Sequence, residues 1–368
     1  MSSAGPLGMP IPPGVSEDDP RPVANRPETI YGVCITLVIL AWIGASCRLG
    51  TRLLITKSPG ADDSFIVVTL VLFSVLCVAV LIAPSYGLGQ HTAFLDAFQL
   101  SKLIMCQYLF GIGYSGSVAT IKISLLFQFL RVFKKYSWQW WIAAATQAIT
   151  CGWGFAMLFI AIFPCLPRPD AWWNGTMKGC YGLASPNQTV AVNLILGHGA
   201  SNLILDTVVF SLAFMLQFET DVPAKRGAAR ALFLVGACSW ALAVWRLAEI
   251  VESKGAGVAF DPAFEQPSAY LISVAEVCLA ALYATIPFFW PVITALNQIF
   301  VKYEFEVSSE SRWPDAGDEI ELARSGTAAS HKHGPIRAGS PVNSHGATLH
   351  YKDPYIQSQL FVAAVPVR

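Results

Sequence analysis

Seven long apolar stretches, each long enough to cross a bilayer as a helix, constrain this chain more than any other feature of its sequence. About 20 residues of helix cover the hydrocarbon core of a membrane. A backbone in lipid satisfies its own hydrogen bonds only as a helix or in a closed barrel. The sequence therefore predicts an all-α bundle of seven transmembrane helices, with spans near 29–49, 65–84, 101–130, 139–165, 187–217, 229–252 and 269–299.

The composition supports a membrane location and gives no reason to expect a nucleic-acid partner. Hydrophobic residues make up 54% of the 368 residues and charged residues only 13%, whereas a soluble domain is about 25% charged. The lipid bilayer is thus the first expected partner of a multi-pass protein, in the plasma membrane or in an internal one. Lys+Arg and Asp+Glu are 24 each, so no net charge favours nucleic acid, and none is expected as a partner.

The two ends of the chain differ from its middle. Residues 1–28 are rich in Pro, Gly and Ser, and residues 301–368 are mostly polar. Such segments bury too little apolar surface to offset the entropy of ordering. We expect a flexible N-terminal tail over 1–28, a membrane domain over 29–300 and a disordered cytosolic tail over 301–368.

Basic residues predict the orientation. No Lys or Arg lies between Ser85 and Ser101, and the other even-numbered loops are poor in them. Loops rich in Lys and Arg face the cytosol, which places the N-terminus outside and the C-terminus in the cytosol. The basic loops follow spans one, three and five, and contain Arg48, Arg52, Lys57, Arg131, Lys134, Lys135, Lys225, Arg226 and Arg230.

One outer loop carries two cysteines and two glycosylation sequons. Cys165 and Cys180 bracket the sequon at Asn174, and a second sequon begins at Asn187, close to the start of span five. An oxidising compartment favours a disulfide between the two cysteines, and the alternative is a pair of unpaired thiols near the interface. We predict the disulfide, and Asn174 and Asn187 as candidate glycosylation sites, Asn174 being the better placed.

Five charged residues lie deep inside the apolar stretches, away from their ends: Lys122, Asp206, Arg246, Glu249 and Glu276. A charge in lipid is costly and normally faces a partner or a cavity. By helix rise, Lys122 lies about 13 Å from the cytosolic end and Asp206 about 24 Å from the outer end, so we predict that they pair in the inner half. Arg246 and Glu276 form a second predicted pair in the outer half, with Glu249 near the outer mouth.

Three roles remain open for these charges. They can be structural salt bridges that fix helix register, groups that face a ligand and switch partners, or members of a proton relay or catalytic site. Breaking a buried pair on one side costs about 3–5 kcal/mol, so loss of folding can mimic loss of function.

A polar stripe runs along span five. His198, Asn202 and Asp206 recur every four residues and share one helical face. The stripe can join helices through hydrogen bonds, or it can line a ligand cavity together with Tyr114, Ser117 and Gln128. His91, in an outer loop, is expected to be a solvated interfacial residue.

The sequence lacks the common signatures of catalytic and metal sites. It contains no G-x-S-x-G elbow, no H-E-x-x-H pair and no CxxC or CxxH cluster. We therefore expect no metal or other cofactor, and we assign no catalytic residue.

A series of short motifs runs in order from Arg26 to about Pro291. It comprises Arg26-Pro27, Arg48, Arg52, Asp62-Asp63, Gly87–His91, Lys122-Ile123-Ser124, Phe127, Arg131-Val132-Phe133, Cys165-Leu166-Pro167, Trp172, Cys180, Asp206, Arg246, Glu276 and Pro287. In this order the motifs resemble the fungal rhodopsin-domain family of integral membrane proteins. That family includes relatives of fungal surface-sensing receptors and proteins of mycotoxin gene clusters such as the satratoxin cluster.

The resemblance implies a seven-helix, multi-pass fold without fixing an activity. A retinal Schiff base requires a lysine in the last span, and none lies between Pro267 and Val301. We therefore expect no light sensing through retinal.

Three functions fit these features. We favour a non-enzymatic, receptor-like sensor of a small apolar metabolite, in which the two ion pairs rearrange and the basic loops meet a cytosolic signalling partner. The alternative is an accessory or catalytic protein of a secondary-metabolite pathway, with Glu276 or Asp206 donating a proton to a hydrophobic intermediate. A transporter is least favoured, because the chain shows no inverted repeat.

Overall fold

The structure is a computed structural model that describes residue 6 and residues 20–310, apart from 58, 177, 219–222 and 256–260. Within this range it leaves out the side chains of 55–56, 188, 217–218, 223–229, 253–255 and 287–310. The predicted flexible tails, 1–28 and 301–368, lie mostly outside the described residues. The residues of each tail that adjoin the membrane domain are helical: the first long helix begins at Pro27, and the last continues to Glu310.

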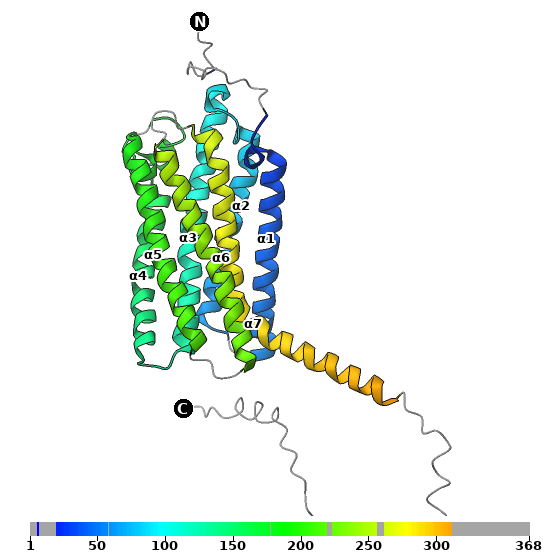
Figure 1. Cartoon of the computed structure of the whole chain (residues 1–368). Helices are drawn as coiled ribbons and strands as arrows, with labels where there is room; N and C mark the ends of the chain where they lie inside the picture. The colour runs from blue at the N-terminus through cyan, green and yellow to red at the C-terminus, as the bar shows by residue number, and fades with distance from the viewer. Residues whose placement is uncertain are drawn as a thin grey trace, which may run out of the picture. The chain divides into compact units, whose positions relative to one another are not determined.

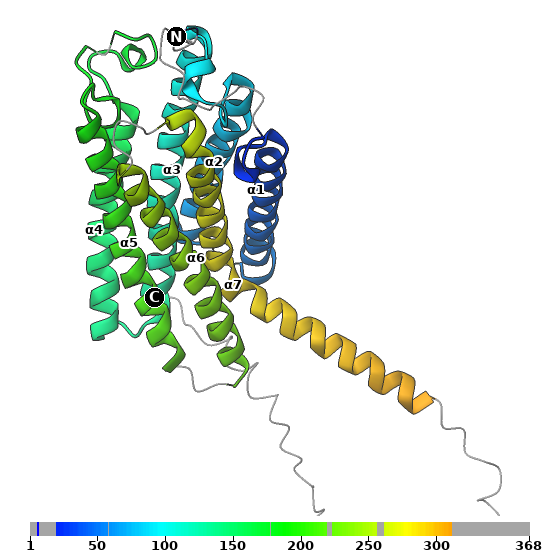
Figure 2. The ribbon, with the colours of Figure 1, turned by 45° about the horizontal axis from the view of Figure 1, so that its top comes forward.

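Seven long helices account for the described chain, and all seven are long and apolar enough to cross a membrane. The predicted all-α fold is confirmed, and each expected span falls mainly on one helix. α1 and α4 stand on opposite sides of the bundle (Figures 1 and 2). The helices are α1 (Pro27–Gly50), α2 (Ala61–Ile82), α3 (Ala97–Val132), α4 (Trp138–Ile162), α5 (Gln188–Phe218), α6 (Pro223–Gly255) and α7 (Pro262–Glu310).

Local sequence explains where several helices begin. Asp96 caps α3 by accepting a hydrogen bond from the Gln99 backbone N–H at 2.6 Å, and the Gln99 side chain accepts from the Asp96 N–H at 3.0 Å. This capping box satisfies two N–H groups that the helix itself cannot. The Ser137 hydroxyl caps α4 by accepting a single hydrogen bond from the Trp140 N–H at 3.2 Å. α1 starts with Pro27 at its first position, where a missing N–H costs nothing.

α3 is the central helix of the bundle. In its most apolar part 72% of the residues are buried, compared with 17% in α4 and 22% in α6. Glycines allow its close contacts, since a Cβ on Gly113 would come within 2.7 Å of the Leu76 backbone nitrogen. Apolar surface gains little by leaving lipid for protein, so membrane helices associate through such close packing. Large apolar side chains such as Ile149, Phe155 and Ile204 remain exposed on the outer faces, where lipid would surround them.

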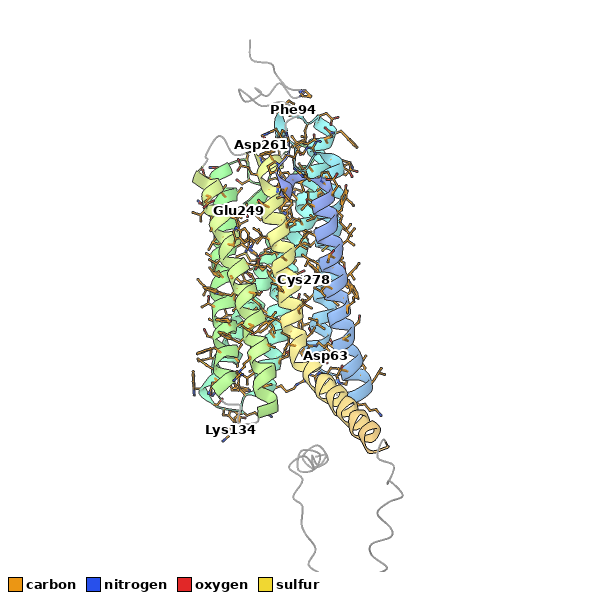
Figure 3. All side chains as sticks on the ribbon, turned by 45° about the vertical axis from the view of Figure 1, so that its right-hand side comes forward. Asp63, Phe94, Lys134, Glu249, Asp261 and Cys278 are labelled. Carbon is orange, nitrogen blue, oxygen red and sulfur yellow. A yellow bond between two sulfur atoms is a disulfide. The ribbon has the colours of Figure 1, made fainter. Side chains whose placement is uncertain are left out.

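The N-terminal segment, the α2–α3 connection and the start of α7 meet at one end of the bundle. Asn25 Nδ2 donates to the Phe264 carbonyl at 2.7 Å, and the Gly89 N–H donates to the Ala263 carbonyl at 2.8 Å. Gly89 has a φ of +90°, a conformation that favours glycine. Figure 3 shows Phe94 and Asp261 at this end, and Asp63 and Lys134 at the other.

His91 contradicts the expectation of a solvated side chain. Its Nδ1 lies 3.0 Å from Asp261 Oδ2, and its ring stacks on Phe264 with centroids 3.9 Å apart. Only 21% of its side chain is exposed. Asp261 and Phe264 are distant from His91 in the sequence, so no local sequence pattern indicated the contact.

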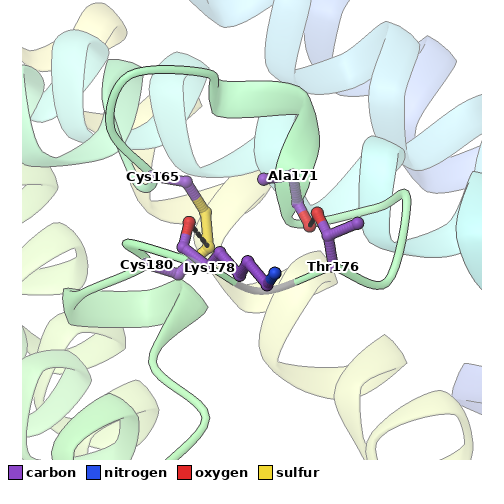
Figure 4. Close-up of a disulfide and its surroundings, with 5 residues drawn as sticks. All are labelled: Cys165, Ala171, Thr176, Lys178 and Cys180. Carbon is purple, nitrogen blue, oxygen red and sulfur yellow. Dashed lines mark hydrogen bonds between the residues drawn. A yellow bond between two sulfur atoms is a disulfide. The ribbon is translucent and has the colours of Figure 1, made fainter.

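The predicted disulfide is present in the loop between α4 and α5. Cys165 and Cys180 are bonded (Figure 4), and the Tyr181 N–H donates to the Pro164 carbonyl at 2.9 Å beside them. Trp172, within the closed loop, is buried against Tyr108 of α3, whereas Asn174 is exposed. The disulfide thus holds a structured loop over one end of the bundle.

Candidate functional site

The two predicted ion pairs exist inside the bundle. Lys122 Nζ on α3 lies 2.9 Å from Asp206 Oδ1 on α5, and Arg246 Nε on α6 lies 3.0 Å from Glu276 Oε2 on α7. Lys122, Arg246 and Glu276 are each no more than 5% exposed. The pairs join four helices, and each cation has an anion on another helix, as the cost of a lone charge in lipid requires.

A single neutral side chain links the two pairs. Asn202 Oδ1 accepts from Lys122 Nζ at 2.7 Å, and Asn202 Nδ2 donates to Asp206 Oδ2 and to Glu276 Oε1, both at 3.0 Å. The expectation of two separate pairs at different depths is therefore wrong in one respect, because they form one network. Counting helix rise gives depth along each helix, but the rotations that turn all four groups toward Asn202 are a tertiary property.

Tyr114 completes the network at the Arg246 side. Its hydroxyl donates to Glu276 Oε2 at 2.9 Å, and the Arg246 guanidinium carbon lies 4.7 Å from the centre of its ring. A cation over an aromatic face is attracted by the ring quadrupole. Both oxygens of Glu276 thus accept hydrogen bonds from protein groups, and the four charges of the network sum to zero.

A cavity of about 510 Å³ lies directly against this network. Its walls come from α3, α4, α5, α6, α7 and the disulfide loop, which contributes Trp172 and Leu183. Most of its lining is apolar. Its polar lining residues include Gln107, Tyr114, Ser115, Thr189, His198, Arg246, Glu249, Glu265, Gln266 and Ser273.

The cavity agrees only in part with the alternative in which the span-five stripe lines a ligand site. His198 and Tyr114 line it. Asn202 is fully buried in the network, and Asp206 borders a separate small void of about 30 Å³ with Lys122. Ser117 and Gln128, which that alternative also included, do not line the cavity. Ser117 is fully buried, and Gln128 Nε2 donates to the Ala284 carbonyl at 3.2 Å.

Glu249 and Glu265 border the cavity toward the end where the disulfide loop lies. Figure 3 shows Glu249 between the middle of the bundle and the end that carries Asp261. This agrees with the predicted place of Glu249 near the mouth. Glu265 was missed because it precedes the expected start of the last span, whereas α7 begins at Pro262.

A second ionic cluster, formed by Arg48, Arg52, Asp62, Asp63 and Arg131, lies at the opposite end of the bundle. Arg48 Nη2 is 2.6 Å from Asp62 Oδ2, Arg52 Nη2 is 3.0 Å from the same oxygen, and Arg131 Nη2 is 3.0 Å from Asp62 Oδ1. In the sequence these residues indicated only the topology and the family resemblance. The spacing of Arg48 and Arg52, one helical turn apart, was a usable signal for a shared acidic partner.

The described residues contain no group of three or more His, Cys, Asp or Glu side chains placed to hold a metal ion. The geometry instead offers an apolar chamber beside the disulfide-bonded loop. The polar side chains of Tyr114, His198 and Arg246 form one wall of the chamber, here called its floor, and Tyr114 and Arg246 connect it to the charge-balanced network. Such a chamber can receive a small molecule and couple its presence to the ion pairs beneath it.

Comparison with known proteins adds two findings. The family model described as "Fungal rhodopsin domain" matches residues 47–295, more than half of the chain. A SAT4 family membrane protein of Emericella nidulans is 24% identical over 243 residues. That match covers 62% of this chain and 55% of the relative, so the chain spans about half of the relative's length.

Proposed function

The chain belongs to the fungal rhodopsin domain family, and we propose that this multi-pass membrane protein acts as a receptor-like sensor of a small apolar molecule. The single observation that carries the proposal is the shared boundary of cavity and network: Tyr114 and Arg246 line the cavity and also contact Glu276. A volume of about 510 Å³ falls within the ~300–1,000 Å³ of ligand pockets.

A ligand in the cavity would act on the network through its floor. Displacing Arg246 or Tyr114 alters their contacts with Glu276, and Glu276 shares Asn202 with the Lys122–Asp206 pair. A ligand shifts a conformational equilibrium only through contacts that differ between two states. We propose that the two states differ in which cation of the network pairs with which carboxylate.

The proposed topology places the disulfide loop outside and the Asp62 cluster toward the cytosol. It rests on the positive-inside distribution and on the disulfide. Lys134 and Lys135 are exposed at the proposed cytosolic end and would contact a signalling partner. Arg131 is less available, because it pairs with Asp62, and the side chains of Lys225 and Arg226 lie outside the described residues.

A catalytic role in a secondary-metabolite pathway has weaker support. Glu276 accepts from Asn202, Tyr114 and Arg246, and the Asp206 oxygens face Lys122 and Asn202. Neither carboxylate lines the cavity, so neither would contact a hydrophobic intermediate bound there.

The test uses matched cavity and surface variants of the full-length protein in lipid nanodiscs. Ala161 lines the cavity, whereas Ala148 lies on the exposed face of the same helix. A photoreactive hydrocarbon diazirine should label cavity peptides of the wild type and of Ala148→Phe. Labelling of these peptides should fall in Ala161→Phe, whose added ring takes up part of the chamber.

Amide hydrogen exchange then separates a sensor from a passive binder. The probe should alter exchange at the cytosolic ends of α3 and α5 in wild type and Ala148→Phe only. Labelling confined to lipid-facing helices would contradict the proposal, as would binding without any change in exchange. Chemical conversion of an added metabolite would favour the enzymatic alternative.

A further inference from the structure

Two nitrogen atoms in the side chains that form the cavity floor have no hydrogen-bond partner in the described part of the chain. They are Arg246 Nη2 and His198 Nε2, and both atoms are shielded from solvent. Arg246 is 5% exposed and lines the cavity together with His198. A buried donor without an acceptor is costly, so such atoms in a ligand-sized cavity indicate where a ligand oxygen binds.

Both groups are held in place by protein contacts that leave these nitrogens unused. Arg246 is fixed by its Nε bond to Glu276 and by the ring of Tyr114. The His198 ring stacks on Trp153 with centroids 5.2 Å apart, and Trp153 is itself tied to Ser201 by a hydrogen bond of 2.9 Å. Preorganised groups lose little entropy when a ligand binds.

The charges around the cavity decide which kind of oxygen fits. Arg246 is already balanced by Glu276, and the walls add the carboxylates of Glu249 and Glu265. A ligand carboxylate would bring an unbalanced negative charge into this surrounding. A hydroxyl or carbonyl oxygen accepts from Arg246 without adding charge, and a hydroxyl can also bond to His198 Nε2 in either tautomer.

We propose that the ligand is a compact apolar molecule whose leading end carries one uncharged oxygen, a hydroxyl or a carbonyl, that binds Arg246 Nη2 and His198 Nε2. The apolar body of the ligand contacts the side chains above the floor, which include Phe110, Met157, Ile160, Leu194 and Ile195. This inference rests on the proposed function and deepens it by naming the ligand class.

The experiment compares probes that share one bicyclic hydrocarbon body and one diazirine but end in methyl, hydroxyl, ketone, carboxylate or ammonium. Saturation labelling of cavity peptides gives an apparent affinity for each. We expect the hydroxyl or ketone probe to bind about 10- to 100-fold more tightly than the methyl probe, which is the range for a hydrogen bond to a charged group. The carboxylate and ammonium probes should show no such gain.

Conservative variants locate the effect. Arg246→Lys keeps a cation beside Glu276 but lacks the second nitrogen of the fork, and His198→Phe keeps a ring against Trp153 but lacks Nε2. Each should remove most of the gain of the oxygen probes and leave the methyl probe unchanged. Tyr283→Phe is the matched control: its buried hydroxyl also has no partner, but Tyr283 borders the small void and not this cavity. It should preserve the gain.

The outcomes distinguish this inference from the proposed function. Equal labelling of the cavity by methyl and oxygen probes overturns the inference and leaves the sensor proposal standing. Strongest binding by the carboxylate or ammonium probe also overturns the inference. Absence of any cavity labelling overturns both. If Arg246→Lys does not fold, the test rests on His198→Phe, which changes no residue of the ion pairs. In that variant, an undiminished affinity advantage of the oxygen probes over the methyl probe contradicts the proposal.

Discussion

Asn202 is the residue on which the buried network depends most. It is neutral, yet it gives or receives three hydrogen bonds with charged groups, all between 2.7 and 3.0 Å. An amide suits this position because it accepts on one atom and donates two bonds from the other. A carboxylate in its place would have no donor for Asp206 and Glu276.

The first prediction concerns this amide. Asn202→Leu should lower the free energy of unfolding by about 2–5 kcal/mol, since each lost bond to a charged group costs about 1.5–3 kcal/mol and coupled bonds do not add fully. Reversible denaturation in mixed micelles, followed by Trp fluorescence, measures the difference.

Ala200→Leu on the same helix is its control, because Ala200 is exposed and such changes usually stay within about 0.5 kcal/mol. If the two variants unfolded alike, the network around Asn202 would have no special weight.

At the scale of the helices, the second ionic cluster, which surrounds Asp62, joins α1, α2, α3 and α7. Arg48 on α1 reaches Asp62 on α2 and also donates to the Ala284 carbonyl on α7 at 2.6 Å. Arg131, at the end of α3, meets the same carboxylate from a more open position. The cluster therefore fixes α1, which has only 28% of its most apolar part buried, against the rest of the bundle.

The two arginines should differ sharply on substitution. The Arg48 side chain is 0% exposed and that of Arg131 is 47% exposed. Arg48→Gln should cost about 3–5 kcal/mol, because it leaves a buried acidic pair undercompensated. Arg131→Gln should cost less than about 1 kcal/mol, as exposed ion pairs do.

Thermal unfolding of both variants in the same nanodiscs tests this ranking. A similar loss for Arg48→Gln and Arg131→Gln would mean that water reaches Asp62 as freely as it reaches Arg131. That would refute the buried character of the cluster.

At the scale of the whole molecule, the membrane orientation that we propose rests on several independent features. The basic loops, the disulfide-bonded loop and its sequon all favour the same side as the cytosolic one. The cavity borders the disulfide loop, so in this orientation a ligand would enter from outside or from the outer leaflet.

Glycan mapping tests this orientation. Expressed in a eukaryotic cell, the protein should carry an enzymatically removable glycan that is lost in Asn174→Gln. Asn174 is exposed in the loop, whereas Asn187 lies next to the first turn of α5, close to the membrane. Asn187→Gln should therefore leave the gel mobility unchanged. An unglycosylated wild type that gains a glycan when a sequon is placed beside Lys134 would invert the topology.

The sequence alone determined the seven helices, because apolar length and the backbone's need for hydrogen bonds in lipid are local properties. It also determined that Lys122, Asp206, Arg246 and Glu276 must find partners, since each carries a charge that lipid does not solvate. The partners themselves could be guessed from approximate depth along the helices.

Only the tertiary structure decided that Asn202 joins both pairs, that Ser117 and Gln128 stay outside the cavity, and that Asp62 is surrounded by arginines. These outcomes depend on how each helix is rotated about its axis. Close contacts such as that of Gly113 with Leu76 set those rotations. In a chain apolar on nearly every face, hydrophobic periodicity does not reveal them, because lipid and protein interior are equally apolar.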